Sequence, residues 1–426
     1  MSVLNKDYEK TIEGFKNDQK EAFELVKDFL GKIFEKKTED EEIMEKIART
    51  SKYLVIGGYA GTGKTYLIQK IHEIFNLRFS NCALAGKAAE NLNQKGIPCS
   101  TMHSLIYKPI EENDIVIGYE LKTPEELECD VIMVDEYSML EEEHVEDLLS
   151  FGKPVMFFGD TFQLPPISQI RPRKLATPHI ILTEIRRNSG IIVEFLTRMR
   201  NFEHIGSFSV YKQENGHSFS ILNSNNPLIY ENILNMDKVI CGKNETKLTI
   251  NNFIRQKLKI KDIYPQIDEE LMCLKNKTIK IEEKGKTRKI ELKNGEILKL
   301  KKIRKTKMIL DEQEVVELMF EKDNKSFWVQ ASAEIFKDPK FNYKSYKVNP
   351  RQNKLLFFFD YCYAITVHKS QGSQYKNVLV LAYDMTWMRD DYVHAVYTAA
   401  GRAEEISAVV FQNQNQIDRL LLKKSN

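Results

Sequence analysis

Residues Tyr53-Leu-Val-Ile-Gly-Gly58-Tyr-Ala-Gly-Thr-Gly63-Lys64-Thr65 join a short apolar run to a loop of the pattern G-x-x-x-x-G-K-T. The run predicts a buried strand over 53–58, and the helical spacing of apolar side chains after the loop predicts a helix over 64–75. A strand, a glycine-rich loop and a helix in this order form a cradle in which backbone N–H groups close around phosphate oxygens. The stretch therefore predicts an α/β fold that binds a nucleoside triphosphate.

The loop and one acidic strand end supply the groups that triphosphate hydrolysis needs. Lys64 can reach the β and γ phosphates, and the Thr65 hydroxyl can bind Mg²⁺. Asp135 and Glu136 end the apolar run 131–136, so we expect Asp135 to hold Mg²⁺ and Glu136 to activate water as a general base. Alone, this acidic pair would fit a solvated strand end equally well. The loop positions expected to line the nucleotide are Gly58, Ala60, Gly61, Thr62, Gly63, Lys64 and Thr65.

Apolar runs and helical segments alternate along two parts of the chain, which is typical of parallel sheets that bind ligands beyond their strand ends. In the first part the expected strands are 53–58, 79–85, 131–136 and 154–160, with an amphipathic helix over 18–34. In the second part, after the polar stretch 215–226, they are 238–241, 355–359, 378–382 and 406–411.

A segment of different character, about 266–350, interrupts the second part. It contains short alternating strands and an Asn294-Gly295 turn, which predict a small antiparallel β module. Within it, residues 275–307 hold 14 Lys or Arg against 4 Asp or Glu. A basic surface of this kind favours phosphate contact, although a solvated lysine-rich surface is the alternative.

Composition limits the remaining possibilities. The net charge of +2 excludes a uniformly basic coat, and six widely spaced cysteines without a CxxC pair suggest buried thiols in a reducing compartment. No apolar signal core or membrane-length run is visible. We therefore expect a cytoplasmic protein without a membrane partner.

The short motifs together resemble those of superfamily-1 helicases, and are most similar to the RecD-like branch that includes the phage Dda helicases. In order they are DQKEAF (18–23), GYAGTGKT (58–65), ALAGKAA (83–89), STMHSLI (100–106), VDEYSM (134–139), GDTFQLPPI (159–167), LTEIRRN (182–188), AITVHKSQGSQY (364–375) and YTAAGRAEE (397–405). GDxxQLPP and TVHKSQG are the specific ones.

The resemblance implies two RecA-like parallel-sheet domains of the P-loop NTPase class. The first would span 1–178 with a small pin-like hairpin at about 107–126, and the second 179–265 and 351–426. An inserted β-barrel, or hook, would span 266–350. A plain crossover loop is the alternative for 107–126.

The resemblance also implies roles around ATP. Gln19 would bind the adenine, unless it is a polar residue on the exposed side of its helix. Gln163 would sense the γ-phosphate or orient water. Arg187 and Arg402 would reach the γ-phosphate from the second domain, with Arg186 as the alternative register for Arg187. Gly372 and Gln374 would approach ATP from the same side.

A second set of positions would grip the backbone of single-stranded DNA. The residues concerned are short hydroxyl, imidazole and ammonium side chains, which position a strand without reading its sequence. Solvated or capping roles are the alternative for each, and the histidines are expected to be neutral rather than metal ligands. They are Lys87, Thr101, His103 and Ser104 in the first domain and Thr366, His368, Lys369 and Ser370 in the second.

The chain departs from the family pattern at two motifs. Leu84 and Ala85 replace the Pro and Thr of A-P-T-x-x-A-A, so one hydroxyl contact to DNA is missing or has moved. Gly401 replaces the Thr before Arg402, which puts the coupling of that arginine to DNA in doubt. Neither change touches the hydrolytic groups.

The resemblance implies an ATP-dependent DNA helicase that uses ATP and Mg²⁺, moves 5′→3′ on single-stranded DNA and unwinds forked duplexes in replication, recombination or repair. Such a protein would act as a monomer, with a single-strand-binding protein or replisome components as candidate partners. A translocase that displaces bound proteins with weak unwinding, and an RNA helicase of the same superfamily, are the alternatives. A nucleotide-locked binding module would require a broken hydrolytic set.

Overall fold

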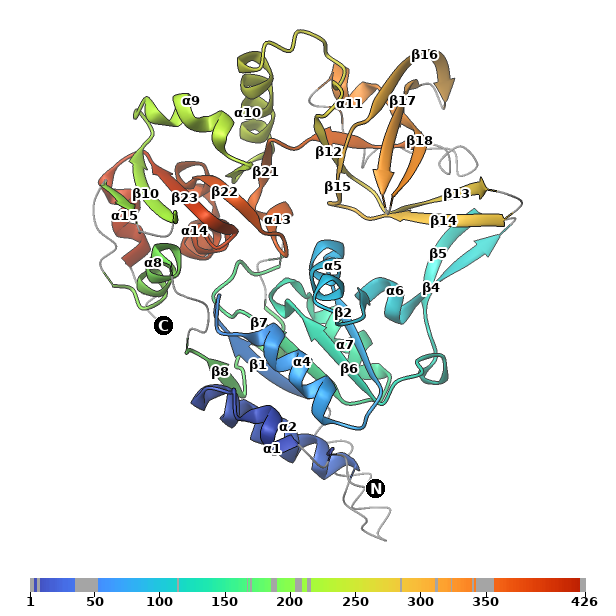
Figure 1. The fold of residues 1–426 in the computed structure, drawn as a ribbon, viewed down its shortest axis with the longest axis vertical. Coiled ribbons are helices and arrows are strands. Elements are labelled where there is room, and N and C mark those ends of the chain that lie inside the picture. Colours follow the sequence, from blue (N-terminus) through green and yellow to red (C-terminus); the bar gives the residue numbers. More distant parts are fainter. Residues whose placement is uncertain are drawn as a thin grey trace.

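The chain folds around two six-stranded sheets, with a smaller group of strands inserted into the second (Figure 1). The computed structural model describes residues 4–5, 8–34, 53–112, 115–166, 168, 171–184, 190–203, 209–212, 216–283, 286–310, 313–322, 324–338, 341 and 356–421. We call the part around the first sheet the first unit, the part around the second sheet the second unit, and the inserted strands the β module.

The first unit is built on a parallel sheet in the order β3-β2-β6-β7-β1-β8. Its strands are β1 Tyr53–Gly58, β2 Phe79–Ala83, β3 Cys99–Thr101, β6 Val131–Asp135, β7 Val155–Gly159 and β8 Ile180–Leu182. Its helices are α1 Tyr8–Ile12, α2 Asn17–Phe34, α4 Lys64–Ile74, α5 Gly86–Gln94, α6 Met102–Ile106 and α7 Glu142–Ser150. Successive residues of a strand point to opposite faces: Leu54 and Ile56 pack with α2 and α4, and Val55 with α6 and α7.

The second unit repeats this plan in the order β21-β11-β22-β23-β10-β9, with only β9 antiparallel to its neighbour. Helices α8 and α14 cover one face, and α9 and α10 the other. The strands are β9 Ser209–Lys212, β10 Ser218–Asn223, β11 Lys238–Cys241, β21 Ala364–Thr366, β22 Tyr375–Leu381 and β23 Ala403–Phe411. The helices are α8 Ile191–Arg200, α9 Leu228–Asn232, α10 Asn244–Lys257, α13 Val367–Ser370, α14 Tyr392–Ala400 and α15 Gln414–Asp418.

The β module has its own core, centred on Phe320, Phe327 and Phe359. In the part that the structure describes, its strands pair as three separate sheets: β15-β12-β20, β16-β17-β18-β19 and the hairpin β13-β14. They are β12 Glu270–Cys273, β13 Lys277–Glu283, β14 Lys286–Leu292, β15 Ile297–Lys299, β16 Lys302–Leu310, β17 Gln313–Lys322, β18 Lys325–Ser332, β19 Leu356–Phe357 and β20 Phe359–Tyr361, with helix α11 at Glu334–Lys337. The predicted antiparallel module is confirmed; its closure into a barrel stays a prediction.

A hairpin projects from the first unit where the sequence predicted one. Strands β4 Tyr107–Glu112 and β5 Ile115–Leu121 pair antiparallel. In Figure 1 this hairpin extends from the first unit toward the strands β13 and β14 of the β module. The alternative of a plain crossover loop is therefore excluded.

Two boundaries predicted from the sequence were wrong. Strand β8 pairs with β1, so the first unit extends past residue 178. The run 355–359 does not join the second sheet, because β19 pairs with β18 and β20 with β12 of the β module. Phe357 and Phe359 lie in the core of the module, whereas Phe358 lies in that of the second unit. Burial on both sides made this segment look like a central strand of a parallel sheet.

The expectation of buried cysteine thiols fits the structure at five of the six positions. All six cysteines carry free thiols, and every one except the half-buried Cys99 is buried. Of the helices that the structure describes, none is both long and apolar enough to cross a bilayer.

Candidate active site and nucleic-acid interface

The phosphate loop follows β1 and leads into α4, at the carboxyl edge of the first sheet. Gly61 and Gly63 have φ values of 81° and 85°, which favour glycine. Gly63 caps α4 without a side-chain hydrogen bond, so the first N–H groups of this helix can bind an anion. Lys64 Nζ donates to Gly58 O at 2.7 Å and to Tyr59 O at 3.2 Å. The Lys64 side chain therefore lies over the loop with which it is expected to bind a phosphate.

Gln19 of α2 is bonded to this loop. Its side chain is fully buried, Nε2 donates to Thr62 O at 3.1 Å, and Oε1 accepts from Lys16 N at 3.3 Å. The alternative of an exposed polar residue is excluded. Because the amide is held against the loop, adenine binding by Gln19 stays a prediction that requires the base to lie beside Thr62.

The acidic pair lies at the end of β6, where it was predicted. Asp135 Oδ1 accepts from Glu136 N at 3.0 Å, and Glu136 takes the left-handed backbone conformation with φ 54°. Glu136 Oε2 is buried without a hydrogen-bond partner. Burial, and next the neighbouring Glu136 carboxylate, raise the pKa of Asp135 to about 7, while Lys64 opposes the rise. Two carboxyl groups with one cation nearby would be neutralised by a divalent metal, so the donors fit Mg²⁺ together with the half-buried Thr65 of α4.

The loop 160–166 joins the two units. Asp160 is fully buried, and its Oδ2 accepts from the Tyr397 hydroxyl of α14 at 2.8 Å. Leu164 N donates to Thr398 Oγ1 at 2.7 Å, and Leu164 O accepts from Gln371 Nε2 at 3.0 Å. The loop that carries Gln163 is thus hydrogen-bonded directly to the second unit.

Gln163 itself is poised for a further partner. Its side chain is 5% exposed, and its Oε1 is buried without a hydrogen bond. The backbone carbonyl of the same residue accepts from Arg171 Nη2 at 2.7 Å, which fixes the position of the loop. An unpaired buried amide oxygen beside a phosphate loop fits the predicted contact with water or phosphate.

Of the two predicted arginines, the structure describes one. Arg402 is 7% exposed, its Nε donates to Thr398 O at 3.0 Å, and its Nη1 donates to Ser373 O at 3.4 Å. Thr398 also hydrogen-bonds Leu164 of the loop 160–166, at the contact between the two units, which we call the seam. Arg402 is therefore linked to the seam through Thr398. Arg186 and Arg187 fall in 185–189, outside the described residues.

The first unit places its predicted nucleic-acid residues on α5 and at the start of α6. Thr101 Oγ1 lies 2.8 Å from Ser104 Oγ and caps α6, which leaves the Ser104 and His103 side chains exposed. Partial desolvation of the ring by the surrounding protein, and next the neighbouring His144, lower the pKa of His103. The imidazole is therefore neutral near pH 7. Lys87 of α5 is half-buried and pairs with Glu90 at 3.1 Å. These side chains carry N–H or O–H groups that can donate to the oxygens of a phosphate backbone.

The second unit places its own set around α13. Thr366 and His368 are half-buried, and burial lowers the pKa of His368. Lys369 Nζ donates to Asn294 Oδ1 of the β module at 2.7 Å. Ser370, by contrast, is fully buried and donates to Val367 O at 2.7 Å. Its predicted DNA contact is not compatible with this position, because the hydroxyl serves to close the short helix. Among the described residues no cluster of three or more metal-binding side chains is present.

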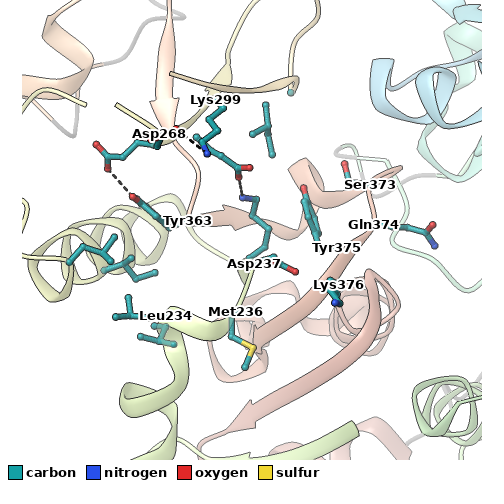
Figure 2. Close-up of a pocket in the computed structure, with 18 of the residues that line it drawn as sticks. Leu234, Met236, Asp237, Asp268, Lys299, Tyr363, Ser373, Gln374, Tyr375 and Lys376 are labelled. Carbon is teal, nitrogen blue, oxygen red and sulfur yellow. Dashed lines mark hydrogen bonds and ion pairs between the residues drawn. The ribbon is translucent and has the colours of Figure 1, made fainter. Parts of the chain in front are cut away.

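Gly372 and Gln374 follow α13. Gly372 has φ 73°, and a side chain there would lie 3.0 Å from Ala88 Cβ of α5. Gln374 is exposed and lines a cavity of about 660 Å³ together with Lys87 and Gly295. Figure 2 shows Gln374 directed away from Tyr363 and Asp268 on the other side of this cavity. No contact of Gln374 with the phosphate loop is present among the described residues, so its contact with ATP stays a prediction.

Family models match both halves of the chain. A model described as an AAA domain matches residues 36–213, and one described as a UvrD-like helicase C-terminal domain matches residues 361–410. The ATP-dependent DNA helicase dda of Enterobacteria phage T4 is 26% identical over 250 residues, which are 51% of this chain and 55% of that protein. The ATP-dependent RecD2 DNA helicase of Deinococcus radiodurans is 32% identical over 163 residues, 36% of this chain and 22% of that protein. The chain is thus similar in sequence to these two ATP-dependent DNA helicases.

Solved structures agree on the fold. One solved structure shows two coordinating Pif1 helicases that unwind forked double-stranded DNA. The match covers 96% of this chain and 94% of that chain, with a TM-score of 0.53 and 16% identity. Bacteroides Pif1 bound to single-stranded DNA covers 90% and 94%, with a TM-score of 0.50 and 17% identity. This likeness shows the fold, with two RecA-like units. This chain aligns with about half of the length of the phage relative, and with less of RecD2.

The chain departs at two motifs from the family pattern that it resembles, and the structure explains the residues at Gly401 and Leu84. A side chain at Gly401 would lie 3.2 Å from Tyr397 O and 3.5 Å from a Leu196 methyl group, so the family's threonine would be crowded here. Ala85 precedes α5 and provides no side-chain cap. Leu84 packs against the core of the first unit, which explains an apolar residue at that position.

Sequence reasoning missed two side-chain pairs that join the two units. The Arg200 guanidinium of α8 lies 3.6 Å from the ring centroid of Tyr59 in the phosphate loop. Tyr397, in the predicted motif 397–405 but without a predicted role, bonds Asp160, and Ala60 of the loop packs against the core of the second unit. No local sequence signal identifies these pairs, because each joins residues from different units.

We expect Tyr397→Phe to lower the stability of the protein by about 1–3 kcal/mol, because a buried Asp160 oxygen would lose its donor. Tyr392 provides a matched control on the same helix: it is also buried, but its hydroxyl has no hydrogen-bond partner. Thermal unfolding should show a lower midpoint for Tyr397→Phe and an unchanged midpoint for Tyr392→Phe. Equal midpoints for the two variants would contradict a stabilising contact across the seam.

Proposed function

We propose that the chain is an ATP-dependent DNA helicase that moves 5′→3′ on single-stranded DNA and separates duplex strands. The observation that carries this proposal is the seam: the loop holding Gln163 bonds through Asp160 and Leu164 to α14, which leads directly into Arg402. A change at the nucleotide is thereby linked to the position of the second unit. The motifs and family matches support helicase chemistry at this seam.

ATP is the proposed fuel. Lys64 would exchange its bonds to Gly58 O and Tyr59 O for bonds to phosphate oxygens, and Glu136, with its unpaired buried Oε2, would take a proton from the attacking water. Asp135 and Thr65 would hold Mg²⁺, which when bound neutralises phosphate charge. Arg402 and Arg187, both expected to act from the second domain, would stabilise the charge that develops on the γ-phosphate.

Movement along DNA would follow from the difference between the ATP-bound state and the state after phosphate release. A triphosphate that contacts Lys64 on one side and Arg402 on the other favours closure of the units, because only the closed form lets both cations reach it. Hydrolysis and phosphate release remove this bridge and allow the units to open. The residues around α5, α6 and α13 would then grip the strand alternately.

The proposed substrates are single-stranded DNA and forked duplexes, in replication, recombination or repair. The basic segment 275–307 of the β module and the hairpin β4-β5 lie where they could guide and divide the strands. Direction of travel is carried over from the family resemblance. A monomer suffices for this mechanism, and a single-strand-binding protein or replisome components are candidate partners.

The hairpin favours unwinding over protein displacement alone. Its outer part carries Tyr119, which is 69% exposed, and Ile110, which is 39% exposed. Its base is fixed, since the Tyr107 hydroxyl bonds Asp147 and Lys122 Nζ donates to Leu105 O at 2.8 Å. A fixed base with an exposed aromatic side chain is suited to stacking on the first base pair of a duplex.

Replacing residues 109–119 with a short Gly-Ser linker should leave ATPase stimulation by single-stranded DNA intact but lower the unwinding rate. Opening one base-pair step costs about 1.4 kcal/mol of stacking free energy. If the hairpin offsets this cost, its loss should slow unwinding about tenfold. The base residues 107–108 and 120–122 remain, so the first unit keeps its fold. A forked-duplex assay measures the effect, with Lys108→Ala, outside the tip, as control. Unwinding at the original rate would place the wedge elsewhere.

Comparing ATPase rates without nucleic acid, with single-stranded DNA and with RNA of equal length tests the proposal. Strong stimulation by DNA is expected. Stimulation by RNA alone would favour an RNA helicase, and full DNA stimulation without strand separation would favour the translocase.

A further inference from the structure

The tight turn at 293–296, between β14 and β15 of the β module, touches both units. Its shape is fixed locally: Lys293 N donates to Glu296 Oε2 at 2.8 Å, Glu296 N donates to Lys293 O at 3.0 Å, and Gly295 has φ 87°. Gly295 N also donates to Cys273 O at 2.8 Å, which ties the turn to β12. The two side chains that it presents are therefore held in defined places.

Lys293 lies against the first unit. A side chain built on Gly86 would meet Lys293 Cδ at 2.7 Å and Lys293 Cβ at 3.0 Å, so the lysine stem crosses the first residue of α5. Burial and the Asp135 carboxylate raise the pKa of Cys99 to about 12, and the Lys293 ammonium opposes this rise. The ammonium is thus close to β3, the strand that ends at Thr101. Lys293 lies between two segments predicted to grip DNA.

Asn294 lies against the second unit. Its Oδ1 accepts from Lys369 Nζ of α13 at 2.7 Å, and its N–H donates to Asn276 Oδ1 at 2.7 Å. The same turn therefore connects the nucleic-acid motif of the first unit, through Lys293, with that of the second unit, through Lys369. The adjoining cavity, lined by Lys87, Gly295 and Gln374, lies at this three-way junction (Figure 2).

Lys293 lies beside the motif position at which this chain lacks a hydroxyl contact to DNA that the family pattern has. Ala85, immediately before Gly86, stands where the family carries a threonine, and it offers no hydroxyl. The nearby carboxylates are already paired, Glu296 with Lys322 at 2.7 Å and Glu90 with Lys87 at 3.1 Å. No ion pair is present for Lys293 among the described residues, so its charge can serve an external anion.

We propose that Lys293 binds the phosphate backbone of single-stranded DNA beside α5, replacing from the β module the contact that Ala85 cannot make. Asn294 holds Lys369 in register with it, so that one turn aligns the grips of both units. This inference rests on the proposed function, since the ligand is the strand on which the helicase moves. We therefore expect the β module to contribute a phosphate contact whenever the first unit binds single-stranded DNA.

The test is binding of a fluorescently labelled oligo(dT) to the full chain at several salt concentrations. Lys293→Ala should weaken binding by about fivefold to tenfold and reduce the slope of log affinity against log salt by about 0.7, the value for one phosphate contact on a single strand. Lys293→Arg should keep both quantities. Lys337→Ala is the matched control and should keep both quantities: it removes the same charge from the same module, but Lys337 of α11 lies outside the basic segment 275–307 and pairs with Glu314 and with Glu334.

A second substitution tests the replacement itself. Adding Ala85→Thr to Lys293→Ala should recover part of the affinity without recovering the salt slope, because a hydroxyl contact releases no counterion. Thermal unfolding of each variant shows that the fold is kept. Wild-type affinity and slope in Lys293→Ala would overturn this inference alone. A wild-type chain that does not bind oligo(dT) would overturn the proposed function and this inference with it.

Discussion

Replacing Arg402 by alanine should lower the rate of ATP hydrolysis by about a thousandfold while leaving ATP affinity nearly unchanged. An arginine that stabilises the transferring phosphoryl group contributes about 10³–10⁵ to kcat in related phosphoryl-transfer enzymes. Arg402 is almost fully buried next to Thr398, which bonds the loop of Gln163, so its guanidinium is held near the seam. Steady-state ATPase with saturating DNA and titration with a fluorescent ATP analogue separate the two quantities.

Arg198→Ala is the matched control for this prediction. Arg198 belongs to the same unit, but it is 45% exposed and pairs with Glu194 on the surface of α8. Its loss should leave hydrolysis unchanged. Arg402→Lys should recover only part of the activity, because an ammonium keeps the charge without the planar fork. If Arg402→Ala loses affinity and turnover equally, the arginine only binds the nucleotide.

Glu136→Gln should lower turnover by at least two orders of magnitude and preserve ATP binding. A general base contributes about 10²–10⁴ to the rate, and glutamine keeps the shape of the side chain but cannot take a proton. The buried, unpaired Glu136 Oε2 at the end of β6 is the atom expected to bind the attacking water. Single-turnover hydrolysis measures the chemical step directly.

Glu146→Gln provides the comparison, since Glu146 lies exposed on α7 of the same unit. That variant should hydrolyse ATP at the wild-type rate. Because glutamine also removes a like charge beside Asp135, ATP and Mg²⁺ should bind at least as tightly to Glu136→Gln as to the wild type. Undiminished turnover would remove Glu136 from the catalytic role.

The parts of the molecule that could be predicted from sequence are those with a local cause. The phosphate loop, the strand before it and the helix after it follow from glycine spacing and apolar periodicity within one short stretch. The antiparallel β module likewise follows from alternation and turn residues, whereas the hairpin at β4-β5 was expected from the resemblance to the helicase family. The acidic strand end could be assigned only together with the loop, because an Asp-Glu pair has many uses.

The parts that could not be predicted depend on contacts between distant segments. Tyr397 and Asp160 are 237 positions apart, and nothing near either residue indicates that they form a buried hydrogen bond. The stacking of Arg200 on Tyr59 is of the same kind. Ser370 was assigned to DNA from its motif, but a four-residue helix needs its hydroxyl for closure. Side-chain chemistry alone does not distinguish an exposed hydroxyl from a buried one.

Strand separation on tailed duplexes tests the central claim most directly: two units that share one ATP at their seam convert its hydrolysis into movement along DNA. The wild-type chain, given ATP and Mg²⁺, should separate a short duplex that carries a 5′ single-stranded tail, and Glu136→Gln should not. A duplex with only a 3′ tail should stay intact. Failure to separate either duplex, under conditions in which single-stranded DNA stimulates ATP hydrolysis, would contradict the account.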